Sequence, residues 1–169
     1  MDACASCRFF RRHNQHSHHH LLGSDVNTIN FGCSIAPTNA AAVLGIEVWI
    51  DDQKLFDQDH VQEHHQISTD LSDDEGEHEL RLVLKNKLSE HTEVDADNNI
   101  VSDARISVSD IEFDGISLTH LVPALAKYQH NFNGSGEPIV DEFYGELGCN
   151  GTVTLKFTTP IYLWLLENI

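Results

Sequence analysis

The stretch Ile46-Glu47-Val48-Trp49-Ile50-Asp51-Asp52-Gln53-Lys54-Leu55-Phe56 carries the clearest fold signal in this chain. Its first five residues are rich in β-branched and aromatic side chains and partly alternate between apolar and polar, which predicts a strand. Asp51-Asp52 has the chemistry of a tight turn, and Lys54-Leu55-Phe56 returns as the second strand. We therefore predict an antiparallel hairpin here.

Similar patterns recur along the chain. Leu80 to Leu84 alternates with period two, as expected for a half-buried strand. Ile106 to Phe113 predicts a strand with one irregularity, and the Asp114-Gly115 pair after it is a strong hairpin signal. Val153 to Phe157 alternates again. Because the strands are short, separated by turn residues and free of a sustained helical period, we predict an all-β fold, an antiparallel β-sandwich or jelly-roll over residues 44–169.

The charge balance limits the possible partners. The 169 residues include 10 Lys and Arg against 27 Asp and Glu, for a formal net charge of −17. We therefore expect nucleic acid and anionic membrane surfaces to repel the chain. Residues 1–20 contain no apolar signal-peptide core and no apolar run reaches transmembrane length, so we expect synthesis in the cytoplasm and no membrane association.

Residues 1–43 predict an extended N-terminal arm with metal-binding chemistry. Cys4 and Cys7 are separated by the two-residue gap that lets both thiolates face one ion, and Gly32 permits a second turn beside Cys33. We predict a structural zinc site with the ligands Cys4, Cys7, Cys33 and His16; His13 and His18 are equally reachable. Two alternatives stay open: a disordered basic tail with unpaired thiols, or a disulfide between Cys33 and one of the first two cysteines.

A weaker candidate is a calcium loop. Asp95, Asp97 and Asn99 match the first, third and fifth positions of an EF-hand-like loop. The match then breaks, because Ile100 occupies the glycine position. A plain hairpin turn between Glu93-Val94 and Ile100-Val101 is the favoured interpretation.

Glycan recognition is a further candidate. Such sites combine an aromatic ring with Asp, Asn or Glu side chains that bind sugar hydroxyls. Tyr128 and Tyr144 are the candidate sugar-binding aromatics, and Tyr144 in Phe143-Tyr144-Gly145-Glu146 is a better exposed candidate than Trp49, which lies in a predicted strand. No nucleophile elbow, P-loop, zinc-protease or dinucleotide motif is present, so we predict no enzyme and disfavour a glycan hydrolase.

The span from Leu44 to Ser117 resembles the calcium-dependent xylan-binding module. The resemblance rests on the segment that begins at Ile46, on Glu77 to Asn86, and on Asp103-Ala104-Arg105-Ile106. It implies a β-sandwich in which the loop before the last strand pair, here Lys87 to Ser102, supplies calcium and sugar contacts. It also adds Asp103 to the candidate calcium ligands, and it implies recognition of host glycans as one possible function.

Two other segments resemble parts of phage proteins. Cys4-Ala-Ser-Cys7-Arg8-Phe9-Phe10 with Gly32-Cys33 and Pro37 resembles small metal-binding modules of bacterial and phage proteins. The whole span 44–169 resembles structural proteins of tailed phages that infect marine cyanobacteria, and its distinctive part is Gly148 to Phe157 followed by Thr159 to Glu167. This implies a virion component, in tail, baseplate, fibre or capsid decoration, that is made in the host cytoplasm and assembles with other virion proteins and with further copies of itself.

Overall fold

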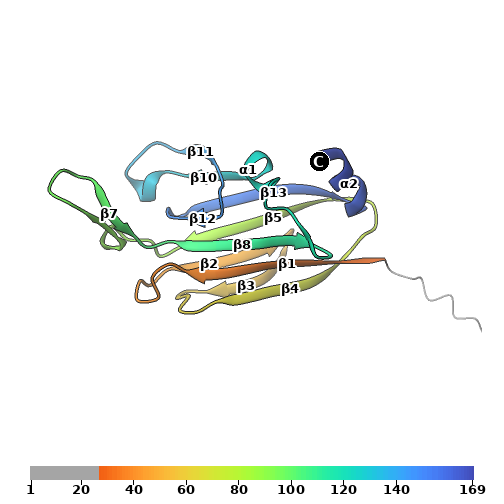
Figure 1. Ribbon diagram of the computed structural model, residues 1–169, viewed down its shortest axis with the longest axis horizontal. Coiled ribbons are helices and arrows are strands. Elements are labelled where there is room, and N and C mark those ends of the chain that lie inside the picture. The colour runs from red at the N-terminus through yellow and green to blue at the C-terminus, as the bar shows by residue number, and fades with distance from the viewer. Residues whose placement is uncertain (1–26) are drawn as a thin grey trace, which may run out of the picture.

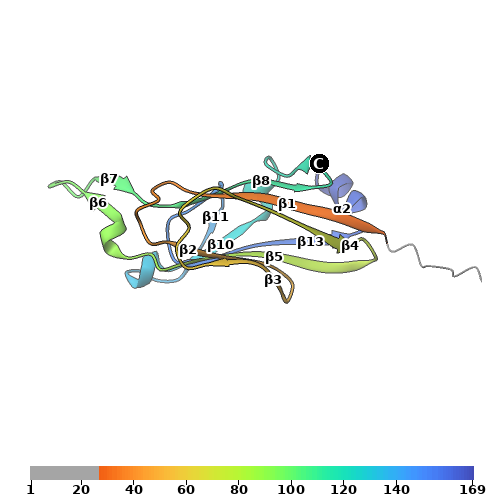
Figure 2. The same cartoon turned by 90° about the horizontal axis from the view of Figure 1, so that it is seen from below.

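The structure is a computed structural model, and it describes residues 27–169 of the chain. The predicted all-β antiparallel sandwich is confirmed, because two antiparallel sheets lie face to face (Figure 1 and Figure 2). A separate ribbon of two strands projects from one end. No helix within residues 27–169 is long and apolar enough to span a membrane.

The first sheet has the order β12-β8-β1-β4, and β9 pairs with the far part of β8. The second sheet has the order β11-β10-β13-β5-β2-β3. The first sheet consists of β1 (Thr28–Pro37), β4 (His65–Ser72), β8 (Ile106–Phe113), β9 (Ile116–Ser117) and β12 (Glu146–Leu147). The second consists of β2 (Gly45–Ile50), β3 (Gln53–Gln58), β5 (Gly76–Lys85), β10 (Lys127–His130), β11 (Ile139–Glu142) and β13 (Gly151–Thr159).

The remaining elements are short. The projecting ribbon consists of β6 and β7, which pair only with each other among the described residues. The ribbon strands are β6 (Thr92–Val94) and β7 (Ile100–Asp103). The other short elements are the helices α1 (Val122–Leu125) and α2 (Ile161–Asn168), and single 3₁₀ turns at Ser89–His91 and Phe132–Gly134.

The predicted hairpins are present. β2 and β3 pair in antiparallel register, and Asp51 turns the chain between them with a φ of 51°. β8 and β9 pair around Asp114-Gly115, where both residues have positive φ, as the favoured two-residue hairpin turn requires. The Leu80 to Leu84 pattern lies in β5, which pairs with β2 on one side and β13 on the other.

The predicted domain boundary at Leu44 is wrong, because the sandwich begins at Thr28. β1 was expected to be part of the arm, yet it lies in the middle of the first sheet between β4 and β8. Ile29, Phe31 and Ile35 are buried in the core. The strand is hard to recognise in sequence because the residues between its buried apolar side chains, such as Gly32 and Ser34, are small rather than charged or strongly polar. The alternation of apolar and polar residues that marks a strand is therefore weak here.

A chain of aromatic rings joins the two sheets and the last helix. The ring centroids of Phe31 and Phe113 are 5.6 Å apart within the first sheet. Phe113 meets Phe157 of β13 at 4.9 Å across the core, and Phe157 meets Trp164 of α2 at 6.2 Å. The apolar C-terminal run therefore forms a helix that closes one end of the sandwich, with Pro160 immediately before it.

Replacing Phe157 with alanine should lower the free energy of unfolding by about 3–5 kcal/mol, because it leaves a cavity where both sheets and α2 meet. Phe132→Ala is the matched control, since this ring is 47 % exposed, and it should cost less than about 1 kcal/mol. Urea denaturation measures both values. Equal losses for the two variants would contradict this description of the core.

Candidate functional site

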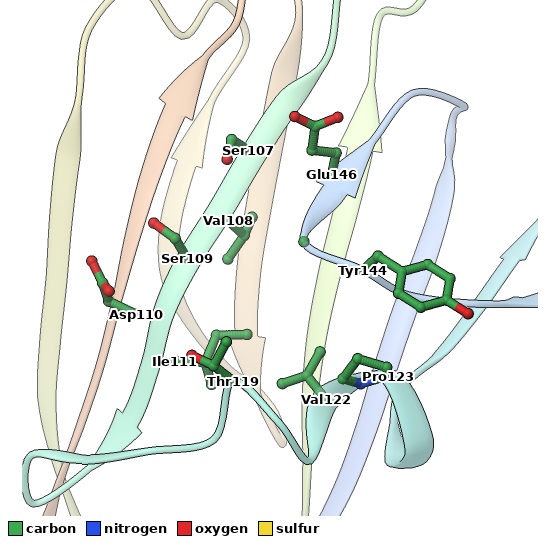
Figure 3. Close-up of a pocket in the computed structure, with 11 residues that line it drawn as sticks. Ser107, Val108, Ser109, Asp110, Ile111, Thr119, Val122, Pro123, Tyr144 and Glu146 are labelled. Atoms are coloured by element: carbon green, nitrogen blue, oxygen red, sulfur yellow. The ribbon is translucent and has the colours of Figure 1, made fainter.

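A shallow hollow of about 380 Å³ lies beside β8 at the edge of the first sheet (Figure 3). β8 forms one side, and Tyr144 and Pro123 stand on the other side, so segments far apart in sequence meet here. We call this hollow the β8 groove. It is lined by Ser107–Ile111, Thr119, Val122, Pro123 and Tyr144–Glu146.

The groove lies where β8 lacks a neighbouring strand. β12 pairs with Ile106-Ser107 at the start of β8, and β9 pairs with Glu112-Phe113 at its end. Between these two pairings, no strand of the described chain covers Ser109-Asp110 on this side. Backbone polar groups along an open strand edge are available to a ligand.

A β-bulge places Asp110 in the groove. The register between β1 and β8 slips opposite Gly32 and Ser34, and Asp110 has a φ of 52°, which is uncommon for a residue other than glycine. The extra residue leaves Ser109 and Asp110 both exposed, while Ile111 returns to the core. This bulge is the predicted irregularity in the strand. Bulges of this kind often redirect a side chain next to a functional site.

Tyr144 is the exposed aromatic of the groove, with 75 % of its surface accessible. Its hydroxyl donates a hydrogen bond to the Glu142 carboxylate, and this bond raises the pKa of the phenol. The next residue, Gly145, has a φ of 105°, and its carbonyl accepts a hydrogen bond from the backbone N–H of Val108 at 2.8 Å. The backbone beside Tyr144 is therefore tied to β8, while the ring stays accessible.

The groove carries acids and hydroxyls, and none of its lining residues is basic. Its carboxylates belong to Asp110 and Glu146, and Glu146 accepts a hydrogen bond from Arg105 at 2.8 Å. Asp110 is exposed. Hydroxyl groups come from Ser107, Ser109 and Thr119. This combination suits an uncharged ligand rich in hydroxyl groups and opposes the binding of an anion.

Tyr128, the other predicted sugar-binding aromatic, lies in the core. It is 6 % exposed, and burial raises the pKa of its phenol. Its hydroxyl donates to the carbonyl of Cys149 and accepts from the backbone N–H of Cys149 at 3.0 Å. Tyr128 therefore holds the loop before β13 in place and is not accessible to a ligand.

The four candidate calcium ligands do not converge on one point. Asp95 lies at the tip of the β6–β7 hairpin and accepts hydrogen bonds from the backbone N–H groups of Asp97 and Asn99, both at 2.9 Å. These bonds hold the pKa of Asp95 below its ordinary value. Asp103 lies at the other end of the hairpin, opposite Thr92. The predicted hairpin turn is confirmed, and backbone N–H groups of the turn occupy the Oδ1 atom of Asp95.

Asp103 instead anchors the hairpin to the sandwich. Its carboxylate accepts hydrogen bonds from Lys87 Nζ at 2.5 Å, from Thr92 Oγ1 at 2.7 Å and from Arg105 Nε at 3.1 Å. Burial alone would raise the pKa of Asp103, but these three donors outweigh it and hold the pKa below its ordinary value. The Lys87 side chain is almost fully buried, and its ammonium also donates to the carbonyl of Ala104.

The predicted zinc site is only partly within the described residues. Cys33 lies in β1 with 2 % of its surface exposed, and burial raises the pKa of its thiol to about 12. Because zinc binds thiolate, this environment disfavours Cys33 as a ligand. Cys4, Cys7 and His16 lie outside the described residues, so the zinc site stays a prediction. Within residues 27–169, no three His, Cys, Asp or Glu side chains are grouped as a metal site.

Sequence reasoning missed the polar part of the groove. Ser109, Asp110 and Thr119 come from β8 and from the chain after β9, and only the tertiary fold brings them near Tyr144. The irregular spacing between Val108 and Ile111 was the one available signal, because it reveals an extra residue at that point of the strand.

Comparison with known proteins gives one distant structural likeness. No family model matches the chain, and no curated protein matches it in sequence. A solved structure described as vCBM60 in complex with galactobiose superimposes with a TM-score of 0.41 and 14 % identity, over 76 % of this chain and 97 % of that chain. A likeness this distant assigns neither a family nor a ligand to this protein.

Asp103→Asn should lower the free energy of unfolding at neutral pH by about 3 kcal/mol, because it leaves the buried Lys87 ammonium without its charged partner. Asp97→Asn is the matched control, since this side chain is exposed in the same hairpin, and it should have little effect.

The same pair of variants tests the pH dependence. The folded-state pKa of Asp103 is lowered, so its contribution to stability is complete above about pH 4 and declines as the pH falls toward the lowered pKa. The stability difference between wild type and Asp103→Asn should therefore shrink below about pH 4. Urea denaturation at several pH values measures it, and a difference that grows on acidification would refute the assignment.

Proposed function

We propose that this protein is a non-catalytic carbohydrate-binding module that recognises uncharged oligosaccharides in the β8 groove. One observation carries the proposal: an exposed tyrosine, two carboxylates and several hydroxyls line one hollow at a gap in the sheet edge. An aromatic face combined with a few placed polar groups is the chemistry that binds the apolar and hydroxyl faces of a sugar ring.

Tyr144 would act as the stacking platform. Its ring is widely exposed, and a tyrosine offers a large apolar face at little cost in conformational entropy. The hydrogen bond to Glu142 fixes the phenol end of the ring. The sugar would then lie between this ring and β8.

The polar side of β8 would bind the sugar hydroxyls. The carboxylate of Asp110 is a hydrogen-bond acceptor, and the hydroxyls of Ser107 and Ser109 both donate and accept. The charge of the groove favours neutral sugars, because the exposed carboxylate of Asp110 would repel a uronate or sulfate group at short range, whereas the carboxylate of Glu146 is paired with Arg105. The shallow, open shape suits one stretch of a longer glycan, since it does not enclose a small ligand.

Tyr144→Ala should weaken binding to the preferred neutral oligosaccharide by roughly tenfold or more, because it removes the stacking face. Tyr144→Phe keeps that face and should lose less. Tyr162→Ala is the matched control, since this exposed tyrosine lies on α2, outside the groove. Isothermal titration calorimetry with neutral oligosaccharides, including galactobiose and xylo-oligosaccharides, gives the affinities.

The same titrations can also refute the proposed glycan site. Equal losses for Tyr144→Ala and Tyr162→Ala, or a preference for acidic over neutral glycans, would refute this site. Recovery of the sugar as shorter fragments would show catalysis and would contradict a pure binding module. Calcium dependence stays a prediction from the sequence, and repeating each titration with a chelator tests it.

A role as a virion component is a second proposal, and the β6–β7 hairpin favours it. The hairpin projects from one end of the sandwich, and its strands pair only with each other among residues 27–169 (Figure 1). Val94, Ile100 and Val101 are each more than half exposed on it. Two-stranded ribbons are marginally stable alone, and their free edges pair readily with other chains. In this proposal the hairpin contacts neighbouring proteins or copies in an assembly.

Ile100→Lys combined with Val101→Lys should abolish self-association measured by sedimentation velocity, because the charges replace the exposed apolar surface of the hairpin. Tyr144→Ala should leave the assembly state unchanged. A wild-type protein that stays monomeric at every concentration would remove the self-assembly part of this proposal without affecting the glycan site.

A further inference from the structure

The outer face of α2 is an exposed apolar surface. The inner face of this helix buries Ile161, Trp164 and Leu165. The outer face exposes Tyr162 by 51 %, Leu163 by 59 % and Leu166 by 71 %. Their spacing of three and four residues places Tyr162 and Leu163 beside Leu166 on one stripe. A helix that is apolar on all sides is normally covered on all sides.

Acidic residues surround this stripe. Glu167 follows Leu166 on the helix, and Asp114 accepts a hydrogen bond from the Tyr162 hydroxyl at 3.1 Å. The turn Asp73-Asp74-Glu75 lies at the start of α2, where the Asp73 carboxylate accepts from the backbone N–H of Ile161 at 2.7 Å. A second copy of the sandwich would place its own carboxylates against these acidic residues, and the like charges would repel each other. The rim therefore fits an occupant that is apolar and basic.

The N-terminal segment enters the sandwich beside this helix. The carbonyl of Asn27 accepts a hydrogen bond from the backbone N–H of Asp73 at 2.8 Å, and Asp73 also holds the first turn of α2. Figure 1 shows the start of β1 at the same end of the molecule as α2 and the C-terminus. Residues 1–26 are therefore tethered within a short distance of the apolar stripe.

The sequence of that segment has the required chemistry. It contains the apolar pair Leu21-Leu22, preceded by three arginines and a histidine cluster. Residues 23–26 separate Leu22 from Asn27, and a tether of this length spans up to about 17 Å. Asn27 and Ile161 are both bonded to Asp73, so a tether of this length can bring the pair to the stripe, which begins at Tyr162 in the first turn of α2.

We propose that Leu21 and Leu22 dock on the outer face of α2 in the same molecule, with the preceding basic residues facing the acidic rim. A tether of only a few residues gives an effective concentration in the millimolar range, so a small apolar contact suffices. Docking would be reversible and would place the arginines against Glu167 and the Asp73-Asp74-Glu75 turn.

Limited trypsin digestion of the full-length protein tests the proposal, because Arg8, Arg11 and Arg12 are cleavage sites within the tethered segment. Cleavage should be slow in the wild type and about fivefold to tenfold faster in Leu163→Asp/Leu166→Asp and in Leu21→Asp/Leu22→Asp, since cleavage tracks the undocked fraction. Combining both pairs should add no further acceleration. Val140→Asp, an exposed apolar position on β11, should cleave like the wild type.

All digestions contain a chelator, so that bound metal does not protect the segment. Equal cleavage rates in all variants would overturn the proposal. A wild-type dimer that Leu163→Asp/Leu166→Asp dissociates, with cleavage unchanged, would also overturn it, because a second copy would then cover α2. If the α2 variant fails to fold, the Leu21→Asp/Leu22→Asp variant decides the question, since both its substitutions precede the sandwich.

Discussion

The packing of Phe113 against Phe157 is the contact on which the rest of the structure depends, because it joins the two sheets across the core. It also fixes the candidate site. Phe113 and Ile111 must both point inward, yet Val108 and Ile111 are separated by an even number of intervening residues. A regular strand cannot satisfy both demands. The extra residue, Asp110, therefore forms a β-bulge, and its side chain lines the β8 groove.

A second, polar connection links the projecting hairpin to the groove. Asp103 at the base of the hairpin bonds Lys87 and Arg105, and Arg105 bonds Glu146 at the end of the groove. The buried part of this network is costly to leave incomplete, which makes it a rigid support. The carboxylate of Glu146 is thereby held in place by the same residues that hold the hairpin. The β8 groove and the β6–β7 hairpin thus share one anchor.

The sequence predicted those parts of the fold that rest on local patterns. The β2–β3 hairpin, the β5 strand and the Asp114-Gly115 turn each have short-range signals, and all three are present. β1 was missed because its small residues conceal the alternation and its partners lie far along the chain. Tyr144 was predicted as an exposed aromatic, whereas Tyr128 was not recognisable as buried, because its position against Cys149 is set by tertiary packing.

The central claim is that a neutral glycan binds in the β8 groove, and amide chemical-shift mapping by nuclear magnetic resonance tests it most directly. The labelled protein would be titrated with the neutral oligosaccharide that binds best. The account predicts shifts concentrated at Ser107–Ile111, Thr119 and Tyr144–Glu146. Shifts centred on the β6–β7 hairpin or on the outer face of the second sheet around Trp49, or no shifts with any neutral sugar, would contradict it.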